Sequence, residues 1–211
     1  MICPLCESPG SLPFWEEQHR PYRRCEQCQL VFVPPAYHLS EAAEKAEYDL
    51  HRNDPADNGY RNFLSRLFNP LGQRLPAGAK GLDFGCGPGP ALAMMLAEAG
   101  FDMTVYDPFY APHKTALRRR YDFIACSEVV EHFRFPGREF TTLWQLLEPG
   151  GWLGVMTKLV IDRQAFARWH YKNDLTHIAF FSRETFGFLA ARLDAHLDFA
   201  GSDVILLQKP R

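Results

Sequence analysis

Apolar and polar residues follow two repeating patterns over most of the chain after residue 80. Short apolar runs, typical of buried strands, are followed by stretches in which apolar residues recur every three or four positions, as on one face of a helix. In chain order these segments are a strand ending at about Asp83, a helix over 91–99, strands over 103–106 and 123–126, a helix over 140–147, a turn over 148–151, a strand over 152–156, a helix from a Ser182 cap to about residue 193, and a strand over 204–208. This alternation predicts a doubly wound α/β domain over residues 76–211.

The first 75 residues follow a different pattern. Residues 1–36 combine two cysteine pairs with short aromatic and β-branched runs, which are typical of strands. Residues 37–75 begin polar and then show helical spacing, which predicts helices over 39–50, capped by Ser40, and over 60–75. This helical linker either packs against the α/β domain or closes over it as a lid.

Composition limits the classes of protein to which the chain can belong. With 211 residues, 46% hydrophobic and 23% charged, it can bury a core of ordinary size, which excludes collagen-like, coiled-coil and disordered proteins. A formal net charge of −2 disfavours a protein that coats nucleic acid, so nucleic acid is not a favoured partner. No run approaches the ~18 uncharged apolar residues of a membrane span, and the N-terminus lacks a signal-peptide pattern. We therefore expect a cytoplasmic protein.

Four of the six cysteines have the spacing of a zinc site. Cys3 and Cys6 form one C-x-x-C pair, Cys25 and Cys28 form a second, and eighteen residues separate the pairs. This spacing suits one tetrahedral Zn²⁺, and a segment of about 40 residues needs such a metal to fold. Four thiolates leave no open position for water, so we expect a structural zinc ribbon. A redox pair and chance cysteines are the alternatives, and balanced charges favour a docking or structural ribbon over a nucleic-acid finger.

A glycine-rich loop over 85–89 follows the strand that contains Asp83. Glycines let backbone amides approach a ligand at the N-terminus of the next helix. Pro90 stands where a dinucleotide-binding loop needs glycine, and Asp83 would repel a pyrophosphate, so the loop favours a ligand with an ammonium group. Asp107, at the end of the next predicted strand, can accept hydrogen bonds from both hydroxyls of a ribose.

Together these motifs resemble those of the class I S-adenosylmethionine-dependent methyltransferases. The similarity covers roughly residues 80–211 and extends through 121–124 and 147–151. The segments 126–133 and 176–182 resemble the branch that contains ubiquinone-biosynthesis O-methyltransferases, and bacterial members of this branch can carry N-terminal cysteine-rich ribbons. The resemblance implies a Rossmann-like sheet of seven strands and S-adenosylmethionine as cofactor. The cofactor-binding residues expected from the loop, Asp107 and this resemblance are Asp83, Gly85, Cys86, Gly87, Gly89, Asp107, Pro108 and Ser127.

One interval departs from the family pattern. Only thirteen residues separate Asp107 from Tyr121, where the family places a helix, a strand and an acidic residue that contacts adenine. The sheet is therefore either complete or shortened by one strand, and the group that holds the adenine is left open.

Four polar residues form the candidate catalytic group. Glu128, Glu131 and His132 lie at positions i, i+3 and i+4, so they share one face if this segment is helical. With His177 they resemble the divalent-metal site of small-RNA 3′-terminal 2′-O-methyltransferases, which implies Mg²⁺ or Mn²⁺. A metal-free reaction with His132 or His177 as general base, and a structural role, are the alternatives. The catalytic residues that we expect are Glu128, His132 and His177.

The function that we expect is methyl transfer from S-adenosylmethionine to an oxygen of a small molecule. Two other functions stay open. One is an RNA-modifying methyltransferase whose ribbon docks RNA, which a strong salt dependence of RNA binding would reveal. The other is a regulator that binds the cofactor and never forms S-adenosylhomocysteine.

Overall fold

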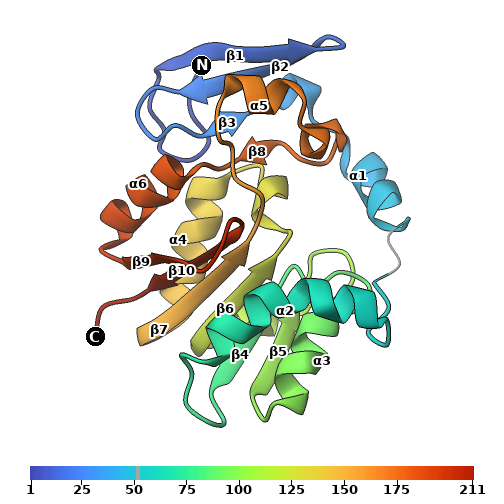
Figure 1. Ribbon diagram of the computed structural model, residues 1–211, viewed down its shortest axis with the longest axis vertical. Helices are drawn as coiled ribbons and strands as arrows, with labels where there is room; N and C mark the ends of the chain where they lie inside the picture. Colours follow the sequence, from blue (N-terminus) through green and yellow to red (C-terminus); the bar gives the residue numbers. More distant parts are fainter. Residues whose placement is uncertain (51–52) are drawn as a thin grey trace.

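A central sheet of six strands organises the chain in this computed structural model, which describes residues 1–50 and 53–211 (Figure 1). The strand order is β5–β4–β6–β7–β10–β9. Strands β5, β4, β6 and β7 are parallel, whereas β10 is antiparallel to both of its neighbours. The bounds are Lys80–Phe84 for β4, Asp102–Tyr106 for β5, Tyr121–Ser127 for β6, Leu147–Met156 for β7, His196–Phe199 for β9 and Val204–Gln208 for β10. A mixed α/β fold of the Rossmann-like kind is therefore confirmed.

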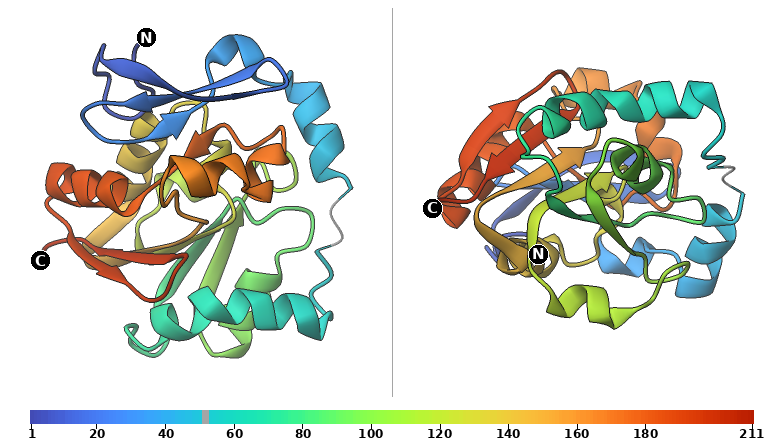
Figure 2. Two further views of the ribbon diagram at one scale, coloured as in Figure 1. Left: turned by 45° about the horizontal axis from the view of Figure 1, so that its top comes forward. Right: turned by 90° about the horizontal axis from the view of Figure 1, so that it is seen from below.

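Helices cover both faces of this sheet (Figure 2). The bounds are Asn58–Gly72 for α2 and Ala91–Glu98 for α3 on one face, and Pro136–Leu146 for α4 and Arg183–Leu193 for α6 on the other. A hydrophobic core lies on each face of the sheet, and successive side chains of β6 point into one core and then the other. Phe123 and Ala125 pack with α2 and α3, and Ile124 and Cys126 pack with α4 and α6. Within the described ranges no helix is long and apolar enough to cross a membrane.

The central sheet is shortened by one strand relative to the seven strands of the family pattern. In the fully described stretch 107–120, between β5 and β6, no strand forms, and Lys114–Arg118 is a 3-10 helix. Strand β5 is therefore the edge of the sheet. Thirteen residues between Asp107 and Tyr121 are too few for both a helix and a returning parallel strand, which needs a crossover of a dozen or more residues.

The N-terminal residues form a second sheet that a distant segment completes. The bounds are Ser11–Glu17 for β1, Arg20–Cys25 for β2, Val31–Phe32 for β3 and Ala179–Phe180 for β8, in the order β1–β2–β3–β8. Val31 lies opposite Phe180 in an antiparallel pair. Figure 1 shows this sheet stacked over α5 (Arg163–Ala167) at one end of the central sheet. We call residues 1–33 the ribbon.

An aromatic core joins the ribbon to the rest of the chain. The Phe166 ring in α5 lies 5.1 Å from the rings of Phe14 and Tyr22, both edge to face. Tyr171 and Phe180 belong to the same buried cluster. The aromatic residues around 169–181 are therefore largely core residues shared with the ribbon.

The two helices of the linker differ in their environment. α1 (Glu41–Tyr48) begins at Ser40, whose Oγ accepts a hydrogen bond from Ala43 N at 3.3 Å, and none of its residues is fully buried. α2 instead buries Leu64, Leu67 and Leu71 against the sheet, so it is a packing element. Residues 51–52 of the predicted linker lie outside the described residues.

The predicted start of α4, at residue 140, is wrong by four residues, because the helix begins at Pro136. The predicted start of β7 is also wrong. β7 begins at Leu147 and contains the stretch 148–151 that was expected to form a turn. Gly150 has a φ of +82°, as a turn residue would, but its N–H donates to Lys209 O at 3.1 Å and Lys209 N donates to Gly151 O at 2.9 Å. Bonds to the C-terminal end of the chain thus extend the strand through a sequence that is locally typical of a turn.

Candidate functional site

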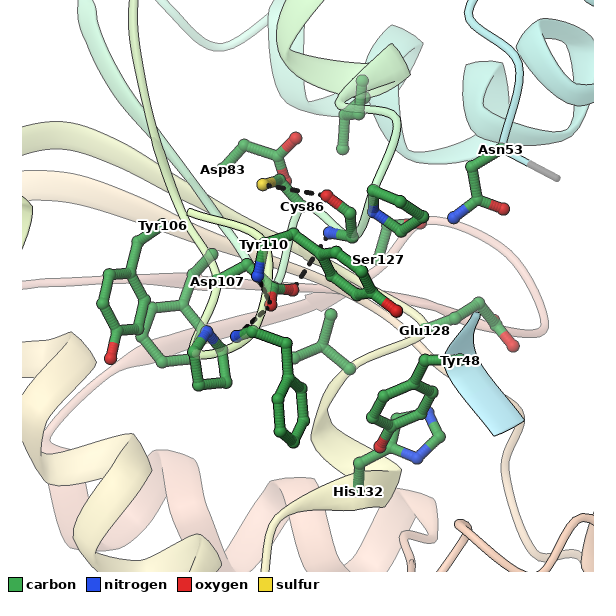
Figure 3. A pocket seen from close by; sticks show the side chains of 18 of the residues that line it. Tyr48, Asn53, Asp83, Cys86, Tyr106, Asp107, Tyr110, Ser127, Glu128 and His132 are labelled. Atoms are coloured by element: carbon green, nitrogen blue, oxygen red, sulfur yellow. Dashed lines mark hydrogen bonds between the residues drawn. The ribbon is translucent and has the colours of Figure 1, made fainter. Parts of the chain in front are cut away.

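A cavity of about 740 Å³ lies at the carboxyl ends of β4, β5 and β6 (Figure 3). The glycine loop, α1, α2 and the segments that follow β5 and β6 line it. Ten residues predicted for the site are in its wall: Asp83, Gly85, Cys86, Gly87, Asp107, Pro108, Ser127, Glu128, His132 and His177. Gly89 and Glu131, among the described residues, do not line the cavity. Most of the predicted site residues therefore lie around one space.

At two positions of the loop, neighbouring atoms lie so close that only glycine fits. Gly85 has a φ of +78°, and a Cβ there would lie 2.6 Å from the side chain of Val129. A Cβ at Gly89 would lie 1.9 Å from the backbone oxygen of Asn53. Gly89 thus makes room for the linker backbone, and its contact with a cofactor stays a prediction.

Asp107 ties the glycine loop to the loop after β5. Its Oδ2 accepts a hydrogen bond from Gly87 N at 3.0 Å, and its Oδ1 accepts from Phe109 N at 2.8 Å and Tyr110 N at 3.0 Å (Figure 3). A carboxylate has about four lone-pair sites, so Asp107 keeps the capacity to accept from a ligand in the cavity.

Asp83 is a buried carboxyl group in the cavity wall, only 3% exposed. Its Oδ2 accepts a hydrogen bond from Ala93 N at 3.2 Å, which fastens the first turn of α3 to β4. Burial, and secondarily the charge of Asp107, raises the pKa of Asp83 to about 7. A cation bound beside Asp83 would lower this pKa, so the position favours a positively charged group.

Two aromatic side chains follow Asp107 in the segment after β5. Phe109 and Tyr110 both line the cavity. The described stretch 108–120 contains no acidic residue, so the adenine-contacting acid of the family pattern has no counterpart there.

Glu128 directly follows β6 and has a left-handed backbone conformation, with a φ of 52°. A non-glycine residue adopts this conformation at a cost, and such strain is concentrated at functional sites. Its Oε2 lies 3.2 Å from the Tyr171 hydroxyl, and its buried Oε1 has no hydrogen-bond partner among the described residues. Burial, followed by the charge of Glu131, raises the pKa of Glu128 to about 8.

Two hydroxyl groups hold the fully buried Glu131. Tyr171 donates a hydrogen bond to Oε1 at 2.6 Å, and Thr157 donates to Oε2 at 3.0 Å. A phenol has one hydrogen, so the shorter bond to Glu131 excludes simultaneous donation from Tyr171 to Glu128. Glu131 therefore lies behind the cavity and fixes the ring of Tyr171.

His132 and His177 lie together, with ring centroids 4.8 Å apart. His132 Nδ1 is 3.1 Å from Thr176 O, and His177 Nδ1 is 2.7 Å from Tyr171 O. Because a carbonyl oxygen only accepts, each Nδ1 carries a hydrogen, and a neutral His177 ring keeps its lone pair on Nε2. Burial, and then the neighbouring His132, lowers the pKa of His177, which favours its neutral form.

Three of the four predicted divalent-metal ligands come together. Glu131, His132 and His177 each offer a ligand atom, and these atoms lie within 4.8 Å of one another. Glu128 is not in this group of described residues. Val130–His132 is a single 3-10 turn, so the α-helical face that the i, i+3, i+4 spacing suggested does not form.

Helix α1 contributes a part of the site that the sequence did not reveal. Tyr48 lines the cavity, and its ring centroid is 5.2 Å from that of His132. The Tyr110 hydroxyl donates a hydrogen bond to Asp49 Oδ1 at 2.7 Å, just beyond the end of α1. Arg134 Nη2 donates to Glu44 Oε2 at 2.7 Å, which holds the middle of α1 beside the cavity. A short polar helix carries no sequence signal for such a role.

The four N-terminal cysteines form a separate cluster. The Sγ atoms of Cys3 and Cys28 are 3.5 Å apart, as are those of Cys6 and Cys25, and all four lie within 4.8 Å of one another. None of them forms a disulfide. Two sulfurs on one tetrahedral Zn²⁺, each at about 2.3 Å, would be about 3.8 Å apart, so the donor set fits this ion.

Known proteins share the sequence pattern and the fold. Residues 56–196 match a family described as a methyltransferase domain. The structure resembles the N-methyltransferase NodS from Bradyrhizobium japonicum WM9 in complex with S-adenosyl-l-homocysteine, with a TM-score of 0.54 and 17% identity over 81% of this chain and 98% of that chain. It also resembles a SAM-dependent methyltransferase from Methanosarcina mazei, with a TM-score of 0.52 and 16% identity over 67% of this chain and 97% of that chain.

Curated protein sequences give no significant match. The family match nevertheless spans more than half of the chain, from α2 to the start of β9. The chain therefore belongs to the methyltransferase-domain family and has the class I methyltransferase fold.

Proposed function

We propose that the chain is an S-adenosylmethionine-dependent enzyme that methylates an oxygen of a small-molecule acceptor. The observation that carries the proposal is a single cavity whose wall includes the glycine loop and Asp107 as well as His132 and His177. At about 740 Å³ it falls in the size range of small-molecule sites. S-adenosylmethionine supplies a methyl group on a positively charged sulfur, and transfer follows in-line attack by an oxygen.

The cofactor would be held by residues on both sides of the glycine loop. Asp83, whose buried carboxyl group favours a cation beside it, would pair with the ammonium group of the methionine part. Asp107 already accepts three backbone hydrogen bonds, so it would accept one from a ribose hydroxyl rather than one from each of the two. Phe109 and Tyr110 offer aromatic faces to the adenine in place of the acidic residue that the family pattern contains.

His177 is the general base in this proposal, with His132 beside it. The bond from Nδ1 to Tyr171 O leaves the Nε2 lone pair to accept the proton of the acceptor hydroxyl. The His177 imidazolium that forms has Asp174 Oδ2 at 3.6 Å from Nε2, and the buried Glu131 nearby. Both carboxylates would stabilise its positive charge.

A divalent ion would compete for the same Nε2 atoms. The described donor set is two imidazoles and one carboxylate, and both oxygens of Glu131 already accept hydroxyl hydrogen bonds. Mg²⁺ and Mn²⁺ prefer oxygen-rich sites. We therefore assign proton transfer to His177 rather than Mg²⁺ or Mn²⁺ binding.

Binding and turnover together test the proposal. The full chain should bind S-adenosylhomocysteine in a calorimeter, and it should form S-adenosylhomocysteine from S-adenosylmethionine with some members of a panel of small phenols and alcohols. Turnover with small amines alone would overturn the assignment of an oxygen acceptor. Binding without turnover on any hydroxyl, amine or RNA substrate would instead indicate a regulator.

We also infer that Cys3, Cys6, Cys25 and Cys28 hold one structural Zn²⁺. The support is the mutual approach of all four sulfurs, at distances that suit one tetrahedral ion. Several buried apolar side chains of the ribbon, among them Phe14 and Tyr22, pack against residues 166–180 rather than within the ribbon, so metal binding would supply folding free energy.

A further inference from the structure

The segment that carries His177 has little regular structure of its own. Residues 170–173 form one 3-10 turn, and the chain then bends at Asp174 before it enters β8. Such a segment leaves backbone carbonyl groups without partners from a helix or sheet, and buried carbonyl groups need donors from elsewhere.

One guanidinium group from the ribbon satisfies four of these carbonyl groups. Arg20 begins β2 and is only 8% exposed. Its hydrogen-bond acceptors are the backbone oxygens of Lys172 at 3.1 Å and Asp174 at 3.2 Å from Nη1, and those of Leu175 at 3.1 Å and His177 at 2.7 Å from Nη2. Only arginine has enough donors in a fixed planar array for such a set, and charge-assisted bonds of this kind are the strong ones.

The ribbon also holds both ends of the segment. The Tyr22 hydroxyl donates a second hydrogen bond to Lys172 O at 3.1 Å. Val33 N donates to Ile178 O at 2.9 Å, directly after His177, and the β3–β8 pairing follows. The position of the His177 ring thus depends on the backbone that Arg20 fixes. Tyr171 O, which sets the tautomer of the ring, lies one residue before Lys172 O, the first of the carbonyl groups that Arg20 bonds.

We propose that Arg20 is a positioning residue for His177, so that the ribbon is a working part of the active site. This inference rests on the proposed function of His177 as a proton acceptor. Arg20 does not line the cavity, so it would have no contact with a substrate bound there. It acts on the histidine through the four carbonyl groups of its segment.

Arg20→Lys and Arg20→Ala test this role in the zinc-loaded full chain. The measurement is the ¹⁵N spectrum of the imidazoles, with the His177 signals assigned by their loss in His177→Gln. In the wild type His177 should be predominantly the Nδ1–H tautomer. Both variants should shift it toward the mixture of a free imidazole, more in Arg20→Ala than in Arg20→Lys, because a lysine ammonium keeps the charge but has only three donors on one atom.

Arg23→Ala is the matched control. Arg23 lies on the same strand, and its Nε donates to Ser11 Oγ at 3.0 Å, within the ribbon. This variant should keep the wild-type His177 spectrum. Amide hydrogen exchange over 177–180 should accelerate by about tenfold or more in Arg20→Lys and stay unchanged in Arg23→Ala.

The possible outcomes separate the two proposals. An unchanged His177 tautomer and unchanged exchange in Arg20→Lys would overturn the positioning role. So would an equal change in Arg23→Ala, because the effect would then reflect general loosening of the ribbon. S-adenosylhomocysteine should bind the Arg20 variants as tightly as the wild type, whereas failure of the wild type to bind it would overturn the proposed function and leave the His177 result intact.

Discussion

Two acidic side chains in the cavity wall have ionisation states that depend on what lies beside them. Asp83 and Glu128 are both pushed toward the neutral form by burial. The sequence placed Asp83 correctly at the cavity, because an acid before a glycine loop is a local motif. It did not reveal the raised pKa of Glu128, which arises from burial in the folded chain and from the charge of Glu131.

The pKa of Asp83 predicts a pH dependence of binding. An unfolded aspartate ionises near pH ~3.9, whereas Asp83 holds its proton up to about 7 in the fold. Between these values the stability of the ligand-free protein should fall as pH rises, since the unfolded chain binds fewer protons. The affinity for S-adenosylhomocysteine, whose ammonium pairs with ionised Asp83, should rise as pH passes through about 7. Calorimetric titrations should show this slope in the wild type and its loss in Asp83→Asn; an identical slope in both would contradict the pairing.

Asp107 carries a second prediction at the residue scale. Asp107→Ala removes the proposed acceptor of a ribose hydroxyl bond, which should weaken S-adenosylhomocysteine binding by about 1.5 to 3 kcal/mol, with part recovered by water. Asp102→Ala, at the start of the same strand and exposed, is the matched control and should bind normally. Equal calorimetric affinities in the two variants would place the ribose elsewhere.

His177→Ala should separate chemistry from cofactor binding. Loss of a general base should lower turnover by about 10² to 10⁴-fold and leave the affinity for S-adenosylhomocysteine nearly unchanged. His113→Ala, which changes an exposed histidine outside the cavity wall, should keep full turnover. Added Mn²⁺ should not broaden the His132 or His177 signals in the wild type; selective broadening of these two rings would show that a divalent ion occupies the site instead.

Among the helices and strands, those whose ends are set by residues close in the sequence were predicted best. The caps at Ser40 and Ser182 begin α1 and α6 as expected, because a cap needs only a side chain and the next turn of backbone. The start of β7 was wrong, since its partners lie at the C-terminal end of the chain. The contact of α1 with the cavity depends on side chains from three elements, and no pattern within the helix reports it.

The contacts of α1 lead to a prediction about cofactor exchange. Tyr110→Phe removes the hydrogen bond to Asp49 and keeps the ring that lines the cavity. Amides of α1 should exchange faster, and S-adenosylhomocysteine should dissociate faster, by a factor of about 2 to 10 if the bond contributes roughly 0.5 to 1.5 kcal/mol. Tyr37→Phe is the control, because the Tyr37 side chain is 48% exposed. Stopped-flow release measurements would refute the role of this bond if the two variants behave alike.

At the scale of the whole molecule, the sequence predicted the individual motifs better than the contacts that join the ribbon to the rest of the chain. The four cysteines and the glycine loop are local motifs, and the structure brings each set together. The shared aromatic core, the β3–β8 pair and the Arg20 bonds join residues far apart in the chain. The sequence carries no signal for the role of Arg20, because a buried arginine and an exposed one look the same in a sequence.

The ribbon should therefore unfold as a unit when its metal is removed. Cys25→Ser leaves three thiolates, so the protein should lose bound zinc and residues 1–36 should become sensitive to protease. Cys86→Ser changes a cysteine outside the cluster and should keep one zinc per chain by elemental analysis. Full zinc content and protease resistance in Cys25→Ser would contradict the assignment of the four-cysteine site.

The pairing of β3 with β8 also affects how the chain matures during synthesis. Val31 in β3 pairs with Phe180 in β8, so β3 has no partner on this edge until about 150 further residues have been synthesised. At about 5 to 20 residues per second, translation leaves that edge unpaired for roughly 7 to 30 seconds. A zinc ion bound early would hold the emerging ribbon folded over this interval, whereas a nascent ribbon made in zinc-poor conditions would stay unfolded and expose its apolar residues to aggregation.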